Sequence, residues 1–388
     1  MDTCVVVAAR LIPPQGRLLN QPTLFHALRK VVQSHAALGV RLCDESSNPS
    51  FERLHKIDLT EVVEFSEISD LEAALEALMQ RPFDTTSDMP LWRVVALKDN
   101  TICFAWHHAL GDGMSGLAFH RALLDSIKEL GNYDPVADWT VIPSKGYFAP
   151  PIEAVLDLTP SWRKVVLEVF RLFAPTSWTR GASAWTGNPV KMHPCITTHA
   201  RLIEFSPDTI LELLPICRSH NATLTSTFHE LAISTISSLI LAEKQHERYK
   251  TISSYVPISL REVAGTSKDV FCDHVSILHT YPLLKTTFSW EEAARYAKLL
   301  RSYIPKSGEE IGMLKFLFGK YEAFFKGKLG KKRLGGPALK MNMVGDPTGG
   351  ITITFTWGDD SLPCSFVEEF ICDFRDGVEE LLNSEATV

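Results

Sequence analysis

The order of apolar and polar residues predicts alternating strands and helices in the first half of the chain. The predicted strands are short apolar runs at residues 5–9, 38–42, 60–65, 92–97 and 101–106. The predicted helices repeat apolar residues at helical spacing at 22–33, at 70–80 and after Gly113. Ser69 and Glu72 form a predicted capping box, and Asp99-Asn100 marks a hairpin turn.

The second half repeats a similar order of elements. Its predicted strands are residues 199–205, 251–257, 274–281, 339–344 and 351–357. Its predicted helices are residues 207–219, 225–244, 290–303 and a closing helix after Pro363. A proline-rich segment from 131 to 160, a helix at 162–173 and an irregular stretch up to 194 separate the halves. Since 388 residues exceed the usual size of one core, we expect two related α/β lobes, 1–188 and 189–388.

Composition narrows the class of protein. Apolar residues make up 45% of the chain and charged residues 22%, which is typical of a globular protein. A net charge of −7 and a pI near 6.0 argue against nucleic-acid binding, which needs a basic surface. No apolar run is long enough for a membrane span, and the N-terminus lacks a basic leader. We expect a cytoplasmic monomer whose eight scattered cysteines are buried free thiols.

The strongest candidate chemistry is the segment His107-His108-Ala109-Leu110-Gly111-Asp112-Gly113, directly after the strand at 101–106. A histidine at a strand end is rigidly mounted, so His108 is the predicted general base. Asp112, carried by a glycine-rich turn, is predicted to point inward and brace the loop. His107 is predicted to be structural. The alternatives are a satisfied core pair of histidines and a metal site. No HExxH, Cys-x-x-Cys or second carboxylate cluster follows, so no metal is predicted.

The motif resembles the signature of the superfamily that contains chloramphenicol acetyltransferase, peptide-synthetase condensation domains, plant BAHD acyltransferases and fungal alcohol acetyltransferases. Further stretches support the fungal alcohol acetyltransferase branch in the expected order: residues 27–38, 90–93, 256–261 and 350–357. The resemblance covers nearly the whole chain. It implies an α/β fold of two pseudo-symmetric chloramphenicol-acetyltransferase-like lobes, with the active site in a tunnel between them.

The resemblance also implies partners for the motif. In related condensation domains an arginine at the position of Arg261 pairs with the motif aspartate, here Asp112, while Gly113 shapes the loop. The alternative for Arg261 is a solvated side chain at a strand end. The plant Asp-Phe-Gly-Trp-Gly element is not matched by Trp357-Gly358-Asp359-Asp360, so no residue is carried over from it. The chain begins almost at its first strand, which fits either a truncation or a shorter protein.

Two segments are candidates for holding an acyl donor. Lys331, Lys332 and Arg333 lie in the only dense cationic run of this acidic chain, and lysines bind the phosphates of coenzyme A as point charges. The alternative is a solvated surface segment. Thr223 and Ser226 offer hydroxyls at a helix start, where capping the helix is the favoured role over holding pantetheine.

Together these features predict a CoA-dependent acyltransferase, with acetyl-CoA or another acyl-CoA as co-substrate and no permanently bound cofactor. His108 accepts a proton from a hydroxyl or amine of a small-molecule acceptor as it attacks the thioester directly. Four tryptophans near the crossover hint at a hydrophobic acceptor: Trp139, Trp162, Trp178 and Trp185. The alternatives are a standalone condensation-type enzyme with a carrier-protein-bound donor and a degenerate member that binds a metabolite.

Overall fold

The computed structural model describes residues 4–12, 19–44, 49–130, 138–173, 178, 180–188, 197–243, 248–317 and 337–385. The chain divides into two compact units. The first comprises Met1–Asp157 and Arg261–Val275, and the second comprises Leu158–Leu260 and Ser276–Val388. These units differ from a division at residue 188, because the chain leaves the first unit after Asp157 and a short segment later returns to it.

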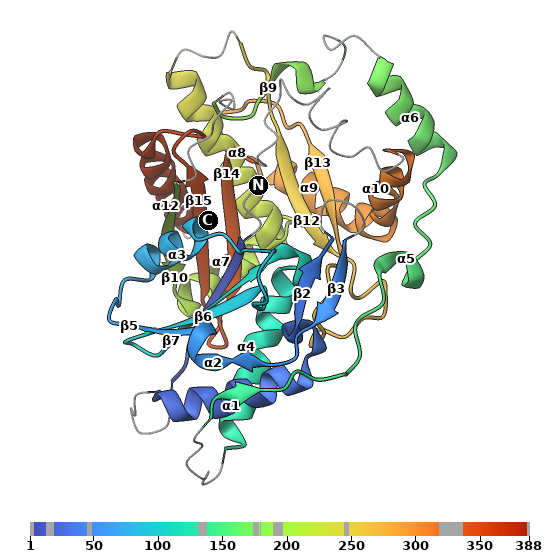
Figure 1. The fold of residues 1–388 in the computed structure, drawn as a ribbon. Helices are drawn as coiled ribbons and strands as arrows, with labels where there is room; N and C mark the ends of the chain where they lie inside the picture. The colour runs from blue at the N-terminus through green and yellow to red at the C-terminus, as the bar shows by residue number, and fades with distance from the viewer. Residues whose placement is uncertain are drawn as a thin grey trace. The chain divides into compact units, whose positions relative to one another are not determined.

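A four-stranded sheet forms the centre of the first unit (Figure 1). Its order is β1 (Cys4–Arg10), β7 (Thr101–His107), β6 (Trp92–Leu97) and β5 (Val63–Ser66). The first three strands are antiparallel, and β5 runs parallel to β6. The predicted hairpin between β6 and β7 is confirmed, and Asn100 in its turn has the positive φ of 66° that asparagine tolerates.

Helices cover both faces of this sheet. Alternate side chains of β7 point to opposite faces, so a strand buried throughout needs cover on both. Helices α1 (Gln21–Ser34) and α4 (Gly113–Lys128) share a core with Phe104 and Trp106, while α3 (Leu71–Gln80) packs with Cys103 and Ala105. Helix α4 lies very close to the sheet, since a Cβ at Gly116 would be 2.5 Å from the Trp106 ring. The residues between β7 and α4 are therefore joined at both ends to tightly packed elements.

Smaller elements complete the first unit: η2 (Ala36–Gly39), β2 (Val40–Cys43), β3 (Ser50–Arg53), β4 (Ile57–Asp58), α2 (Leu59–Val62), β8 (Thr140–Val141) and α5 (Ile152–Val155). Two strand predictions are partly wrong. Residues 38–42 begin as a 3₁₀ turn, and residues 60–65 begin as a helical turn because the Asp58 carboxylate accepts the Thr60 N–H at 2.9 Å. The capping-box prediction is also wrong, since Asp70 caps α3 by accepting from the Glu72 and Ala73 amides.

The second unit contains an antiparallel sheet of β10 (Thr198–Phe205), β15 (Ile351–Gly358) and β14 (Leu339–Gly345). Helices α7 (Pro207–Ser219), α8 (Leu224–Ala242) and α12 (Cys364–Glu385) pack against it around Phe228, Phe355 and Phe374. Thr223 and Ser226 form a reciprocal capping box at the start of α8, so the capping role is confirmed.

The remaining described elements of the second unit are α6 (Trp162–Phe173), η5 (Arg180–Ser183), β9 (Ala184–Trp185), β11 (Thr251–Ile252), β12 (Ser254–Ser259), β13 (Val275–Thr280), α9 (Trp290–Tyr303), η6 (Ile304–Lys306), α10 (Gly308–Met313) and η7 (Leu314–Leu317). Strand β9 pairs in parallel with β11, and β12 pairs with β13. Among the described residues, no helix has the length and apolarity needed to cross a membrane.

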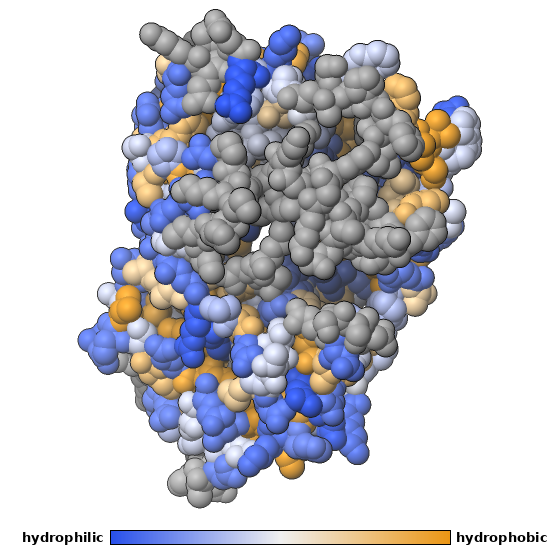
Figure 2. Space-filling model, turned by 45° about the horizontal axis from the view of Figure 1, so that its top comes forward, coloured by the Kyte–Doolittle hydropathy of each residue, from blue (hydrophilic) through white to orange (hydrophobic). Residues whose placement is uncertain are grey.

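The four tryptophans near the crossover have different surroundings within their own units. Trp139 packs edge-on against Phe25 within the first unit, and Trp185 is 8% exposed in the core of the second. Trp162 and Trp178 are largely exposed. On the face shown in Figure 2, hydrophilic and apolar residues are interspersed among the described residues. Trp139 and Trp185 therefore pack with the cores of their own units.

Candidate active site

The histidine motif forms a short turn between β7 and α4. Strand β7 ends at His107, a 3₁₀ turn, η3, spans His108–Leu110, and α4 begins at Gly113. The His107 ring contacts this turn, because its Nδ1 accepts the Ala109 N–H at 3.2 Å. From the other side, the Trp106 indole N–H donates to the carbonyl of Gly111 at 2.9 Å. These hydrogen bonds fix the backbone of the turn, and therefore the position from which the His108 side chain extends.

The two glycines of the motif differ in what requires them. A Cβ at Gly111 would lie 2.3 Å from Ser115 Oγ, so only glycine fits against the first turn of α4. A Cβ at Gly113 would meet no described atom within 4 Å. Packing therefore requires Gly111, which the sequence did not single out, while Gly113 leaves space open beside the turn.

Asp112 is the N-cap of α4 and is almost fully buried, with 1% exposure. Its Oδ1 accepts the Ser115 N–H at 3.0 Å and Arg261 Nη2 at 2.7 Å, and its Oδ2 accepts Arg261 Nε at 3.1 Å. The two-point contact uses the planar fork of the guanidinium. The ion pair expected between Asp112 and Arg261 is therefore present, and the alternative of a solvated arginine is wrong.

Arg261 is 4% exposed, and its other donors bind the backbone of the returning segment. Its Nη1 donates to the carbonyls of Ser267 at 3.1 Å and Val270 at 2.7 Å. The carbonyl of Cys272 accepts from Arg261 Nη2 at 3.0 Å and from the Asp112 amide at 3.0 Å. A buried charged group is tolerated only when it is paired and its polar atoms are hydrogen-bonded, as they are here. The network thereby fixes the segment around residue 272 against the histidine turn.

This arrangement brings Asp273 to His108. Asp273 Oδ2 lies 3.7 Å from His108 Nδ1, and both side chains are about half exposed, at 48% and 50%. Burial raises the pKa of the Asp273 carboxyl, the Asp112 charge adds to this, and His108 acts in the opposite direction. Because Nδ1 faces the carboxylate, the other ring nitrogen, Nε2, is the one that can face a bound substrate. No sequence pattern singles out Asp273.

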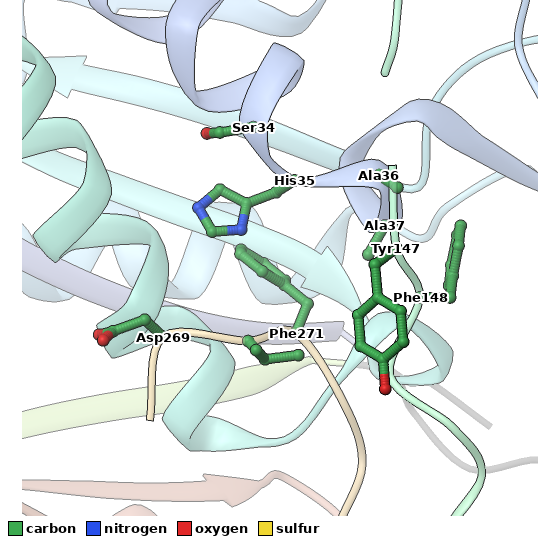
Figure 3. A pocket seen from close by; sticks show the side chains of 9 residues that line it. Ser34, His35, Ala36, Ala37, Tyr147, Phe148, Asp269 and Phe271 are labelled. Atoms are coloured by element: carbon green, nitrogen blue, oxygen red, sulfur yellow. The ribbon is translucent and has the colours of Figure 1, made fainter. Parts of the chain in front are cut away.

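A pocket of about 200 Å³ lies on the same returning segment of the first unit. Figure 3 shows His35 beside Phe271, with Asp269 to one side and Tyr147 and Phe148 from another part of the chain. The His35 and Phe271 ring centroids are 5.1 Å apart, and burial lowers the pKa of His35. Neither His108 nor Asp112 lines this pocket, so it is separate from the predicted catalytic groups.

Lys331, Lys332 and Arg333 fall outside the described residues. Among the described side chains, those close enough to share a metal ion do not include His107 or His108.

The prediction that the cysteines are all buried is wrong. Cys103, Cys217 and Cys272 are buried, whereas Cys364 and Cys372 are exposed. Burial raises the pKa of Cys103 to about 12 and that of Cys272 to about 11, so both thiols are unreactive.

The fold matches those of two solved enzymes. It resembles the TRI3 trichothecene 15-O-acetyltransferase from Fusarium sporotrichioides with a TM-score of 0.64 at 11% identity, over 98% of this chain and 90% of that one. It resembles VibH, a condensation enzyme of nonribosomal peptide synthesis, with a TM-score of 0.58 at 15% identity, over 100% of this chain and 93% of that one. These likenesses confirm the predicted α/β fold class of condensation domains and related acyltransferases.

Sequence comparison then gives the family. The profile of the alcohol acetyltransferase family matches residues 1–276, and the chain belongs to that family. A relative from Aspergillus fumigatus described as a probable alcohol acetyltransferase, crmB, is 26% identical over 261 residues, which cover 61% of this chain and 53% of the relative. The chain spans about half the length of the curated relatives it matches.

Proposed function

We propose that this chain is a CoA-dependent acyltransferase that moves an acyl group, with acetyl as the expected group, to a hydroxyl or amine of a small molecule. The observation that carries the proposal is the half-exposed His108 on a turn fixed by the buried Asp112–Arg261 pair. Membership of the alcohol acetyltransferase family and the shared fold of an O-acetyltransferase support an acetyl donor and a hydroxyl acceptor.

In the proposed reaction His108 is the general base, and no covalent acyl-enzyme forms. His108 Nε2 takes the proton of the acceptor hydroxyl as its oxygen bonds to the thioester carbonyl carbon. The tetrahedral oxyanion then collapses, the carbon–sulfur bond breaks, and the leaving thiolate takes the proton back from His108. Asp112 and Arg261 do not touch the substrates in this scheme. They keep the turn in position, which matters because misplaced catalytic groups lose much of their effect.

A carrier-protein-bound donor is the competing proposal, because a condensation enzyme shares the fold. The two are separated by thiol release from the purified chain, measured with a panel of acyl-CoAs and small alcohols and amines. We expect acetyl-CoA to release thiol only when an acceptor is present. Turnover with carrier-bound donors alone would favour the condensation-type enzyme. Acceptor binding without turnover on any donor would indicate a degenerate, metabolite-binding protein.

Asp273 is proposed to orient His108. A half-exposed ion pair is worth less than about 1 kcal/mol, so Asp273→Asn is expected to lower kcat by only about 2–5-fold. KM for either substrate should stay nearly unchanged, because in this scheme Asp273 acts through His108 and does not bind a substrate. Asp125→Asn, which removes an exposed carboxylate from α4, is the matched control. A loss of kcat no larger than that of Asp125→Asn would contradict this role of Asp273.

The phosphates of the donor are proposed to bind Lys331, Lys332 and Arg333. A chain of net charge −7 repels a polyanion unless cations are gathered locally. Changing all three to alanine should raise KM for acyl-CoA, leave that of the acceptor nearly unchanged, and reduce the salt dependence of KM. Changing Lys298, Arg301 and Lys306 to alanine removes the same charge elsewhere and should have little effect. Equal KM values for acyl-CoA and a minimal thioester without the nucleotide would contradict this assignment.

A further inference from the structure

Three metal-binding side chains meet in the second unit, away from the motif in the sequence. They are His199 on β10, Asp359 after β15 and Cys364 at the start of α12, and their donor atoms all lie within 4.8 Å of one another. His199 Nε2 and Asp359 Oδ1 are 2.6 Å apart. The proposed acyl transfer uses none of the three.

The backbone brings these residues together without help from their side chains. Because β10 and β15 are antiparallel, with His199 opposite Trp357, the beginning of β10 lies at the end of β15. The chain then turns, with the Asp359 N–H donating to the Thr197 carbonyl at 3.3 Å and the Ser361 N–H to that of Gly358 at 2.7 Å. Cys364 follows as the first residue of α12. The cluster is therefore largely formed before any ion binds.

The donor set suits a particular class of ion. An imidazole nitrogen, a carboxylate oxygen and a thiolate sulfur are the donors that bind zinc, and softer sulfur ligands disfavour magnesium and calcium. The two anionic donors would balance a divalent charge. Three protein ligands leave one tetrahedral position for water.

The spacing of the donors is close to what zinc requires. Zinc bonds of about 2.0–2.3 Å place tetrahedral ligands roughly 3.3–3.8 Å apart. The 2.6 Å His199–Asp359 hydrogen bond must therefore open by about 0.7 Å, and any separation near the 4.8 Å limit must close by about 1 Å. Cys364 is exposed, so its side chain is free of the packing that would oppose this rotation.

We propose that His199, Asp359 and Cys364 form a zinc-binding site that joins the start of β10 to the turn between β15 and α12. Its partly exposed position, with His199 and Asp359 side chains 20% and 44% exposed, makes the ion exchangeable. The competing interpretation is a hydrogen-bonded His–Asp pair with an uninvolved thiol beside it.

Cobalt(II) is the probe, because a thiolate ligand gives it a charge-transfer absorption that histidine and carboxylate ligands do not. The whole chain, freed of affinity tag and stripped with a chelator, is expected to bind one Co²⁺ with this absorption, and zinc should displace it. Cys364→Ser should abolish the band and, like His199→Ala, weaken zinc binding by at least about 10–100-fold, since even outer-shell partners of a metal contribute this much. Cys372→Ser removes another exposed cysteine of α12 and should change neither.

A second measurement needs no variant. Zinc should slow alkylation of Cys364 in the wild-type chain, read by peptide mass mapping, while Cys372 reacts at its metal-free rate. Equal alkylation of Cys364 with and without zinc would overturn the proposal. So would a charge-transfer band that survives Cys364→Ser, or the absence of one-to-one binding.

Discussion

Replacing His108 with alanine is expected to lower kcat by about 10²–10⁴-fold, the usual contribution of a positioned general base. The same change should alter the free energy of unfolding by no more than about 0.5 kcal/mol, because the side chain is half exposed and its carboxylate neighbour is 3.7 Å away. Steady-state thiol release and urea unfolding measure the two quantities on one preparation.

His107→Ala is the matched control for this prediction. It removes the acceptor of the Ala109 N–H, so it should loosen the turn while reducing kcat far less than His108→Ala. If a well-folded His107→Ala protein is inactive and His108→Ala retains activity, the two histidines have the opposite roles.

Arg261→Ala and Asp112→Asn should each destabilise the protein by about 3–5 kcal/mol, because either change leaves its partner buried without full compensation. Both should also lower activity, since the network holds the segment that carries Asp273 as well as the turn that carries His108. Urea unfolding monitored by fluorescence gives the change. The exposed pair of Arg121 and Asp269 supplies the control: Arg121→Ala should cost at most about 1 kcal/mol.

A double-mutant cycle tests the pairing itself. The variant with both Asp112→Ala and Arg261→Ala should be more stable than the sum of the single changes predicts, by at least about 1 kcal/mol. Additive changes would mean that the two residues act independently, in spite of their contact in the structure.

Local pattern predicted much of the secondary structure, and it failed where short-range signals competed. Helices α7 and α9 and strand β6 begin and end where the sequence predicted, because long amphipathic repeats and a clear hairpin leave few alternatives. Residues 60–65 are different. An aspartate just before an apolar run caps a helical turn as readily as it precedes a strand, and Asp58 takes the first role.

The sequence could predict only those site residues whose type or spacing is distinctive. Asp112 and Arg261 were paired through a family resemblance. The carbonyl of Cys272, in contrast, has no sequence signature, although it accepts bonds from both. That backbone contact brings Asp273 close to His108, so Asp273 could not be identified without the fold. His199 and Asp359 lie 160 positions apart, which hides them from any search for ligand spacing.

The first unit is discontinuous in sequence, and this sets the order in which it can be completed. Asp112 and Arg261 are separated by 149 positions. At a synthesis rate of about 5–20 residues per second, roughly 7–30 s pass between the synthesis of Asp112 and that of Arg261. The sheet and its helices are available to fold during that interval, but the histidine turn has no partner segment to rest on. A nascent chain stopped before residue 261 therefore carries His108 on a turn that lacks its contacts with Arg261 and with the carbonyl of Cys272.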